Sequence, residues 1–256
     1  MRCLAIVLLV TSLFAISPAS QGQTNCEEGN GPLDTAQPKA MSVQEVIQKF
    51  GAAEVATKEA RLHYTYKQDV LMQTLNGQQV TGEFHEVTTI SYDEKGRRQE
   101  QVTFAAQSSL RGIQLTQEDM EDIRVFMPLM LTSEDLQQYK LTYAGQQHVD
   151  DLDTYEFQVD AKKEEKDKRY FKGRIWVDAQ DFQIVKVCGK SGPEKMQVKK
   201  HQWPDLHATF VTYRQQVDGR WFPAYTRADD TLRFRAGPVH LRETIKYTGY
   251  KRATGQ

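Results

Sequence analysis

Alternating apolar and polar positions dominate the chain between residues 171 and 247. Three strand–turn–strand units follow one another there, with turns at 178–181, Asp218-Gly219 and Gly237-Pro238. Asp-Gly suits a tight reversal because glycine tolerates the positive φ that such turns need. Successive hairpins predict a meandering antiparallel sheet, since parallel strands need crossovers of a dozen or more residues. We interpret this sheet as one wall of an apolar pocket.

The same period of two recurs earlier in the chain. It predicts strands at 62–72, 80–92 and 101–104, with a tight turn at Asn76-Gly77 between the first two, and further strands from residue 140 onward. Together with the later hairpins, this makes roughly ten strands in one sheet.

A helix is expected ahead of the first strand. Ser42 and Glu45 fit a capping box, in which their side chains satisfy backbone N–H groups at the start of the helix. Apolar residues then recur at helical spacing, so one face of the helix must lie on the sheet. These residues are Val43, Val46, Ile47, Phe50 and Ala53.

The alternation stops between residues 110 and 136, where the pattern becomes helical in two pieces. Thr116 or Asp119 would cap the first piece, and Thr132 or Ser133 the second. Pro128 interrupts an apolar, Met-rich stretch between them, and proline breaks or kinks a helix. The stretch is either an ordinary core helix or a lid whose Met and Leu side chains adapt to a ligand.

The N-terminus is typical of an export signal. Arg2 precedes an apolar run at 4–16 that is too short to span a bilayer, and Ser17-Pro18-Ala19 offers a cleavage site. We expect a cleaved signal peptide at 1–22, a flexible tether at 23–40 and a folded domain at 41–252.

Charge and cysteine content agree with export. The chain has 33 Lys and Arg against 34 Asp and Glu, and cleavage removes only Arg2, so no strong electrostatic case exists for nucleic acid. The remaining cysteines, Cys26 and Cys188, form an even pair in an oxidising compartment. We predict a disulfide between them; two free buried thiols are the alternative.

Nothing in the sequence indicates catalysis or a metal site. The six His residues lack metal-ligand spacing, and neither a G-x-S-x-G elbow nor a Gly-rich phosphate loop occurs. The paired carboxylates Asp150-Asp151 and Asp229-Asp230 fall at predicted turns, where solvated side chains are the rule. We expect a binding protein with no cofactor and no metal, and not an enzyme.

The order of these elements, with the hairpin motifs GRIWVDAQDFQIVKV and VDGRWFPAYTR, resembles the LolA-like superfamily of periplasmic lipoprotein carriers, which includes LolB and the lipid-sensing regulator RseB. The resemblance implies an incomplete β-barrel closed by the N-terminal helix and an inserted helical lid. It implies a monomeric periplasmic carrier that holds acyl chains of lipoproteins or lipids for transfer toward the outer membrane, with membrane transport proteins as partners. The alternative is a regulatory module of the RseB type that acts through a membrane protein, although such a regulator would carry a second domain after the barrel.

The residues expected to line the apolar cavity come from the alternating strands and from the insert. Each could equally belong to plain core packing. They are Tyr64, Tyr66, Phe157 and Trp176 from the sheet, and Phe126, Met127 and Met130 from the insert.

Overall fold

A computed structural model describes residues 23–165, 168–192, 195–198, 201–204 and 207–253, with the backbone alone for 195–198 and 201–204. The predicted signal peptide at 1–22 lies outside these residues. In the described part of the chain, no helix combines the length and the apolar character needed to cross a membrane.

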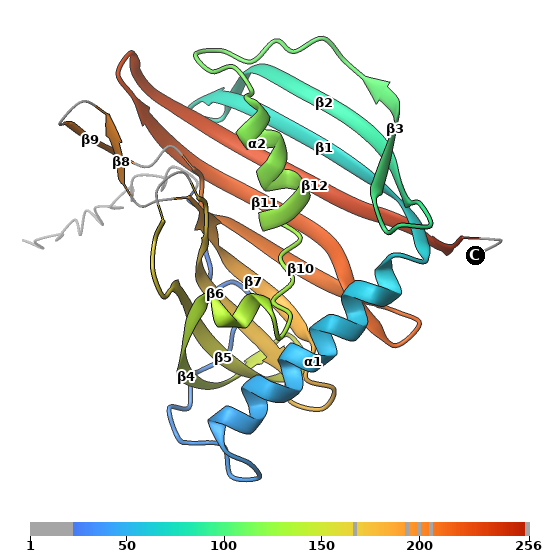
Figure 1. The fold of residues 1–256 in the computed structure, drawn as a ribbon. Coiled ribbons are helices and arrows are strands. Elements are labelled where there is room, and N and C mark those ends of the chain that lie inside the picture. The colour runs from blue at the N-terminus through green and yellow to red at the C-terminus, as the bar shows by residue number, and fades with distance from the viewer. Residues whose placement is uncertain (1–22, 166–167, 193–194, 199–200, 205–206, 254–256) are drawn as a thin grey trace, which may run out of the picture.

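The chain folds as one large antiparallel sheet with a few helices (Figure 1). The helical elements are α1 (Val43–Arg61), α2 (Gln117–Glu121), the π-helix η1 (Asp122–Phe126) and the 3₁₀ helix η2 (Asp135–Gln137). The strands are β1 (Tyr64–Asn76), β2 (Gln79–Tyr92), β3 (Arg98–Ala105), β4 (Tyr139–Val149), β5 (Leu152–Ala161), β6 (Phe171–Asp178), β7 (Ile184–Ser191), β8 (Lys195–Val198), β9 (His201–Pro204), β10 (Phe210–Val217), β11 (Arg220–Phe234) and β12 (Gly237–Arg252).

Ten strands share the main sheet in the order β3-β2-β1-β12-β11-β10-β7-β6-β5-β4, and β8 and β9 form a separate hairpin. The predicted mainly β fold with a meandering sheet of roughly ten strands is confirmed. Asp218 and Gly219 both have positive φ at the turn between β10 and β11, as the sequence predicted. The first and last strands, β1 and β12, pair side by side in the middle of the sheet. The two edges are therefore β3 and β4.

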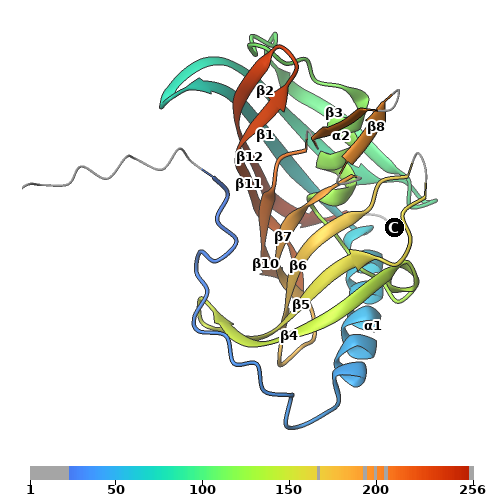
Figure 2. The ribbon, with the colours of Figure 1, turned by 90° about the vertical axis from the view of Figure 1, so that its left-hand side faces the viewer.

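The sheet is strongly curved, and α1 and α2 lie on its concave side (Figure 2). Because β3 and β4 are consecutive in sequence but lie at opposite edges, the connection at 106–138 must pass from one edge to the other. It crosses the concave face and carries α2, η1 and η2 (Figure 1). We call residues 106–138 the strap.

Helix α1 begins at the predicted capping box, in which Ser42 and Glu45 hydrogen-bond each other's backbone N–H groups. Val46 and Phe50 are fully buried on the face that the apolar spacing predicted. Phe50 packs against Phe157 of β5 with ring centroids 5.7 Å apart. The helix therefore covers the half of the sheet that contains β5.

The outer, convex face carries the N-terminal segment, which the sequence predicted to be a flexible tether at 23–40. That prediction is wrong for much of the segment, because Asn30 bridges to Val149 and Asp34 to Gln146 at the β4 edge. The predicted disulfide is present and joins Cys26 to Cys188 of β7. The segment thus finds backbone partners on a sheet edge, which its Gly- and Pro-rich composition did not reveal.

Candidate ligand-binding site

The strap has little regular structure of its own. Thr116 caps α2 through a reciprocal pair of hydrogen bonds with Asp119, but α2 spans only Gln117–Glu121 before it widens into the π-helix η1. Pro128 follows and cannot donate a backbone hydrogen bond, so the helix ends. Thr132 accepts from the N–H of Asp135 and opens only a 3₁₀ turn. The expectation of two helical pieces is therefore correct in position and in the cap at Thr116, but wrong in extent, and the N-cap of η2 is Glu134, which makes no side-chain cap bond.

Polar side chains of the sheet hold the strap by its carbonyl groups. Gln68 Nε2 donates to the carbonyl of Ile123 at 3.4 Å, and Thr212 Oγ1 donates to the carbonyl of Met127 at 2.7 Å. These bonds are needed because carbonyl groups outside regular helix would otherwise be buried without a donor. The concave face therefore combines an apolar surface with a few hydrogen-bond donors.

A buried ion pair ties the strap to α1. Glu54 of α1 and Arg214 of β10 are both fully buried and form two hydrogen bonds of 2.8 and 2.9 Å. Arg214 Nη2 also donates to the carbonyl of Leu129 at 2.5 Å. One guanidinium thus joins the helix, the sheet and the strap.

A second buried carboxylate anchors the start of η1. Asp122 accepts from Ser191 Oγ of β7 at 2.7 Å and forms an ion pair with Arg169. Burial raises the pKa of Asp122, although Ser191 and Arg169 act in the opposite direction. The Arg169 guanidinium also lies 5.4 Å from the centre of the Phe126 ring.

Glu243 of β12 is a buried acid for which the described residues provide no compensating base. It is 2 % exposed, and its Oε1 has no hydrogen-bond partner among the described residues. Burial raises its pKa to about 8, and the negative charges of Asp122 and Asp119 in the strap add to the rise. A neutral carboxyl group therefore lies beneath the strap at neutral pH.

Most of the predicted lining residues lie in the interior. Tyr66, Phe126, Met127 and Phe157 belong to one buried cluster, whereas Met130 is half-buried. Tyr64 is also buried and packs against Phe222, with ring centroids 5.1 Å apart. The structure thus brings residues of the strap together with one face of the sheet in a common core.

Trp176 is the exception, because it lies on the other face of the sheet. It is buried with Val149, Val185 and Val211, and its Nε1 donates to Gln147 at 2.8 Å. Phe171, Ile175 and Val177 of the same strand face the main core, and alternation places Trp176 opposite to them. The expectation that Trp176 shares a lining with Phe157 is wrong.

Trp176 instead forms part of the platform for the N-terminal segment. Lys186 lies 4.6 Å above its ring and donates to the carbonyls of Cys26 and Glu28 at 2.9 and 2.7 Å. Burial lowers the pKa of Lys186 to about 8. This side of the sheet therefore serves to fix residues 26–30.

The space between the sheet and the strap is occupied by the chain's own side chains, including Phe50, Ile123, Leu131 and Phe157. The sequence led us to expect an apolar hollow there. Two clefts, one at each end of α1, are present instead at the surface of the described residues. The cleft beside the start of α1 measures about 500 Å³ and is lined by Ile47, Leu136, Tyr139 and Leu141 among others.

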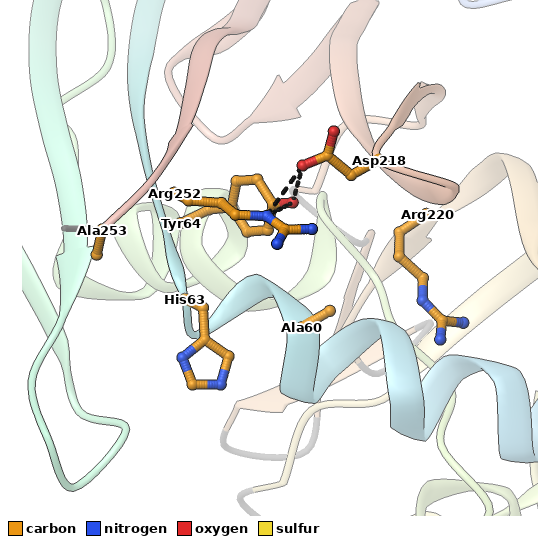
Figure 3. Close-up of a pocket in the computed structure, with 7 residues that line it drawn as sticks. All are labelled: Ala60, His63, Tyr64, Asp218, Arg220, Arg252 and Ala253. Carbon is orange, nitrogen blue, oxygen red and sulfur yellow. Dashed lines mark hydrogen bonds and ion pairs between the residues drawn. The ribbon is translucent and has the colours of Figure 1, made fainter. Parts of the chain in front are cut away.

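The cleft at the C-terminal end of α1 measures about 480 Å³, and most of its lining residues carry polar or charged side chains (Figure 3). We call it the basic cleft. Tyr64 OH donates to Asp218 Oδ2 at 2.5 Å, and Arg252 Nε donates to the same oxygen at 3.1 Å. The remaining lining residues are Ala60, His63, Arg220 and Ala253. No pattern in the sequence predicted this cleft, although Arg220 follows directly on the predicted Asp218-Gly219 turn.

Metal chemistry receives no support from this geometry, because the described side chains contain no group of three or more His, Cys, Asp or Glu placed to hold an ion.

Comparisons with known proteins give likenesses in structure alone. No protein-family model matches the chain, and no curated protein matches it. A DUF1329 family protein from Desulfovibrio piger aligns over 82 % of this chain and 94 % of its own, with 15 % identity and a TM-score of 0.44. A LolA superfamily protein from Nitrosomonas europaea aligns over 85 % and 96 %, with 13 % identity and a TM-score of 0.34. A putative outer membrane lipoprotein-sorting protein domain from Vibrio parahaemolyticus aligns over 82 % and 94 %, with 11 % identity and a TM-score of 0.37.

Proposed function

We propose that this protein is an exported carrier that binds the acyl chains of a lipid or lipoprotein on the concave face of its sheet. The strap covers that face in the unloaded state and moves aside when the hydrocarbon enters. The proposal depends on one observation: the strap, which covers the apolar face of the sheet, contains only short helical turns and is rich in Met and Leu.

The energetics favour such an exchange. A buried CH₂ group is stabilised by about 0.8 kcal/mol, so a long acyl chain can replace the apolar contacts that the strap makes with the sheet. Unbranched Met side chains, such as Met120, Met127 and Met130, can repack around a ligand of variable shape. When the strap moves aside, the side chains of Gln68, Thr212 and Arg214 lose the strap carbonyls to which they donate hydrogen bonds. The ester or amide oxygens of an acyl ligand can then accept hydrogen bonds from these side chains.

The disulfide supports the proposed location. Cys26 and Cys188 are bonded, and such bonds persist in oxidising compartments such as the bacterial periplasm. Carriage of acyl chains between the two membranes of the envelope is therefore the setting that we propose.

Photo-crosslinking with a diazirine-bearing fatty acyl probe, followed by peptide mass spectrometry, tests this function. We expect labels on peptides that contain Phe126, Met127 or Phe157, because these residues share the buried cluster between the strap and the sheet. Trp176 on the convex face is the internal control and should stay unlabelled. Labels confined to the Trp176 peptide, or no labelling at all, would refute binding on the concave face.

Lipid extraction of the protein purified from the periplasm is an independent test. An acylated molecule should co-purify in a defined stoichiometry. Protein that contains no lipid and takes none up from acyl donors would count against a carrier.

A further inference from the structure

The basic cleft at the end of α1 contains positive charge that the protein does not neutralise. Two guanidinium groups, Arg220 and Arg252, the imidazole of His63 and one carboxylate, Asp218, line the cleft, and Asp218 pairs with Arg252 (Figure 3). We propose that this cleft binds the phosphate group of an amphipathic ligand whose acyl chains lie on the concave face. The proposal rests on the proposed function for its lipid part and on the cleft itself for its phosphate part.

Arg252 is fixed by one of its three nitrogens and keeps the other two available. Its Nε donates to Asp218 Oδ2 and to Tyr64 OH, each at 3.1 Å. Figure 3 shows its terminal nitrogens turned toward α1 and the side of the cleft where Arg220 lies. A guanidinium held in this way presents two parallel donors, which is the geometry that suits a phosphate.

Arg220 is the less constrained of the two. It begins β11 directly after the turn and is half-buried. Its guanidinium has neither a hydrogen bond nor an ion pair with any described residue. Because a half-buried cation without a counter-ion is costly, this group is available for an anionic ligand.

The end of α1 does not compete for these cations. The last carbonyls of the helix, those of Glu59 and Ala60, accept from the backbone N–H groups of Leu62 and His63 at 3.1 Å each. These carbonyls are therefore capped by the chain's own backbone and make no hydrogen bond with the guanidinium of Arg220 or Arg252 among the described residues.

A row of aromatic rings joins the cleft to the interior. Tyr64 at the cleft contacts Phe222 at 5.1 Å, Phe222 contacts Tyr250 at 5.2 Å, and Tyr250 stacks on Tyr66 at 4.9 Å between ring centroids. Tyr66 belongs to the main core under the strap. A ligand with its phosphate between Arg220 and Arg252 can therefore lay its hydrocarbon along these rings onto the concave face.

Titration calorimetry with three probes separates the parts of the proposal. The probes are dihexanoylphosphatidylglycerol below its micelle concentration, dihexanoylglycerol with the same acyl chains and no phosphate, and inorganic phosphate. Arg220→Gln is the test variant, and Arg233→Gln is its matched control. Arg233 is an exposed arginine near the other end of the same strand, where it makes no ion pair with any described residue.

We expect Arg220→Gln to weaken binding of the phosphatidylglycerol probe about tenfold or more, as for the loss of one charge-assisted hydrogen bond. Arg233→Gln should bind like the wild type, and dihexanoylglycerol should bind all three proteins equally. Equal affinity of Arg220→Gln and Arg233→Gln for the phosphatidylglycerol probe would overturn the site, as would its failure to bind the wild type.

The remaining outcomes identify which part fails. If inorganic phosphate binds as tightly as the lipid probe and loses the same factor in Arg220→Gln, the lipid part is overturned and the ligand is free phosphate. If the lipid probe depends on Arg220 while dihexanoylglycerol does not bind, the phosphate site is supported and the carrier function is contradicted.

Discussion

Glu243 is a buried acidic residue on an otherwise apolar face of β12. It occupies the same face of β12 as Leu241, Ile245 and Tyr247, all of which are buried. Alternation therefore predicts its burial, but it does not predict the lack of a basic partner. The nearby charges of the strap, on Asp119 and Asp122, are also negative. The carboxyl group consequently remains protonated in the folded protein at neutral pH.

We predict that Glu243→Gln stabilises the protein at alkaline pH. Folding raises the pKa of this carboxyl from its ordinary 4.5 to about 8. Between these values the folded state binds one more proton than the unfolded state, so its stability falls as pH rises through the window and the loss is complete above pH 8. Glutamine cannot ionise, and each unit of pKa corresponds to ~1.4 kcal/mol, so the variant should gain up to several kcal/mol at pH 8.

Urea unfolding at several pH values measures this effect. Glu83→Gln, an exposed glutamate on β2, is the control and should follow the wild type. Parallel pH profiles for wild type and Glu243→Gln would show that the carboxyl is not buried in the way described.

At the scale of elements, the conformation of the strap depends on contacts with residues that are distant in sequence. The sequence offered Thr116 or Asp119 as the first cap, and Thr116 caps α2, because capping depends on side chains only three residues away. It did not predict that the carbonyls of Ile123, Met127 and Leu129 would accept hydrogen bonds from side chains of β1 and β10. Those bonds replace helical hydrogen bonds, which is why the helical pieces are shorter than expected.

We predict that Thr212→Val loosens the strap. The variant leaves the buried carbonyl of Met127 without its donor, at a cost of ~1–3 kcal/mol. Hydrogen exchange of the amides at 122–131 should accelerate about tenfold or more, while that of the central strands stays unchanged.

Thr103→Val is the matched control, because Thr103 makes a comparable bond to the carbonyl of Val87 at an exposed position on β3. Equal protection of the strap in Thr212→Val and wild type would contradict its attachment through this bond.

At the scale of the molecule, two connections hold the curved sheet in shape. The strap passes from the β3 edge to the β4 edge across the concave face, and the N-terminal segment is bonded to the convex face. The disulfide closes a loop with a sequence separation of 162 residues. Arg174 adds ion pairs to Glu27 of that segment and to Glu156 of β5.

We predict that Cys26→Ser/Cys188→Ser lowers the free energy of unfolding without changing the fold. Loss of a disulfide that closes so long a loop lowers the free energy of unfolding by on the order of 5 kcal/mol in the chain-entropy model, and this figure is an upper value. Denaturant unfolding of the variant and of the wild type, with circular dichroism at both end states, measures the loss. Equal midpoints with and without the bond would show that Lys186 and the edge pairing alone fix the segment.

The local periodicities of this protein follow from its amino-acid sequence alone. Alternation set which residues of β1 are buried, Asp218-Gly219 and Asn76-Gly77 set the turns, and Ser42 set the start of α1. Each of these depends on neighbours within a few positions, where backbone sterics and side-chain capping act directly.

Which strands pair, and on which face of the sheet each buried residue lies, follows only from the assembled fold. Pairing of β1 with β12 placed β3 and β4 at opposite edges and forced the strap across the concave face. The same assembly put Trp176 behind the sheet and gathered Arg220, Arg252 and Tyr64 at one cleft. Such placements depend on contacts between segments far apart in the chain, which no local pattern records.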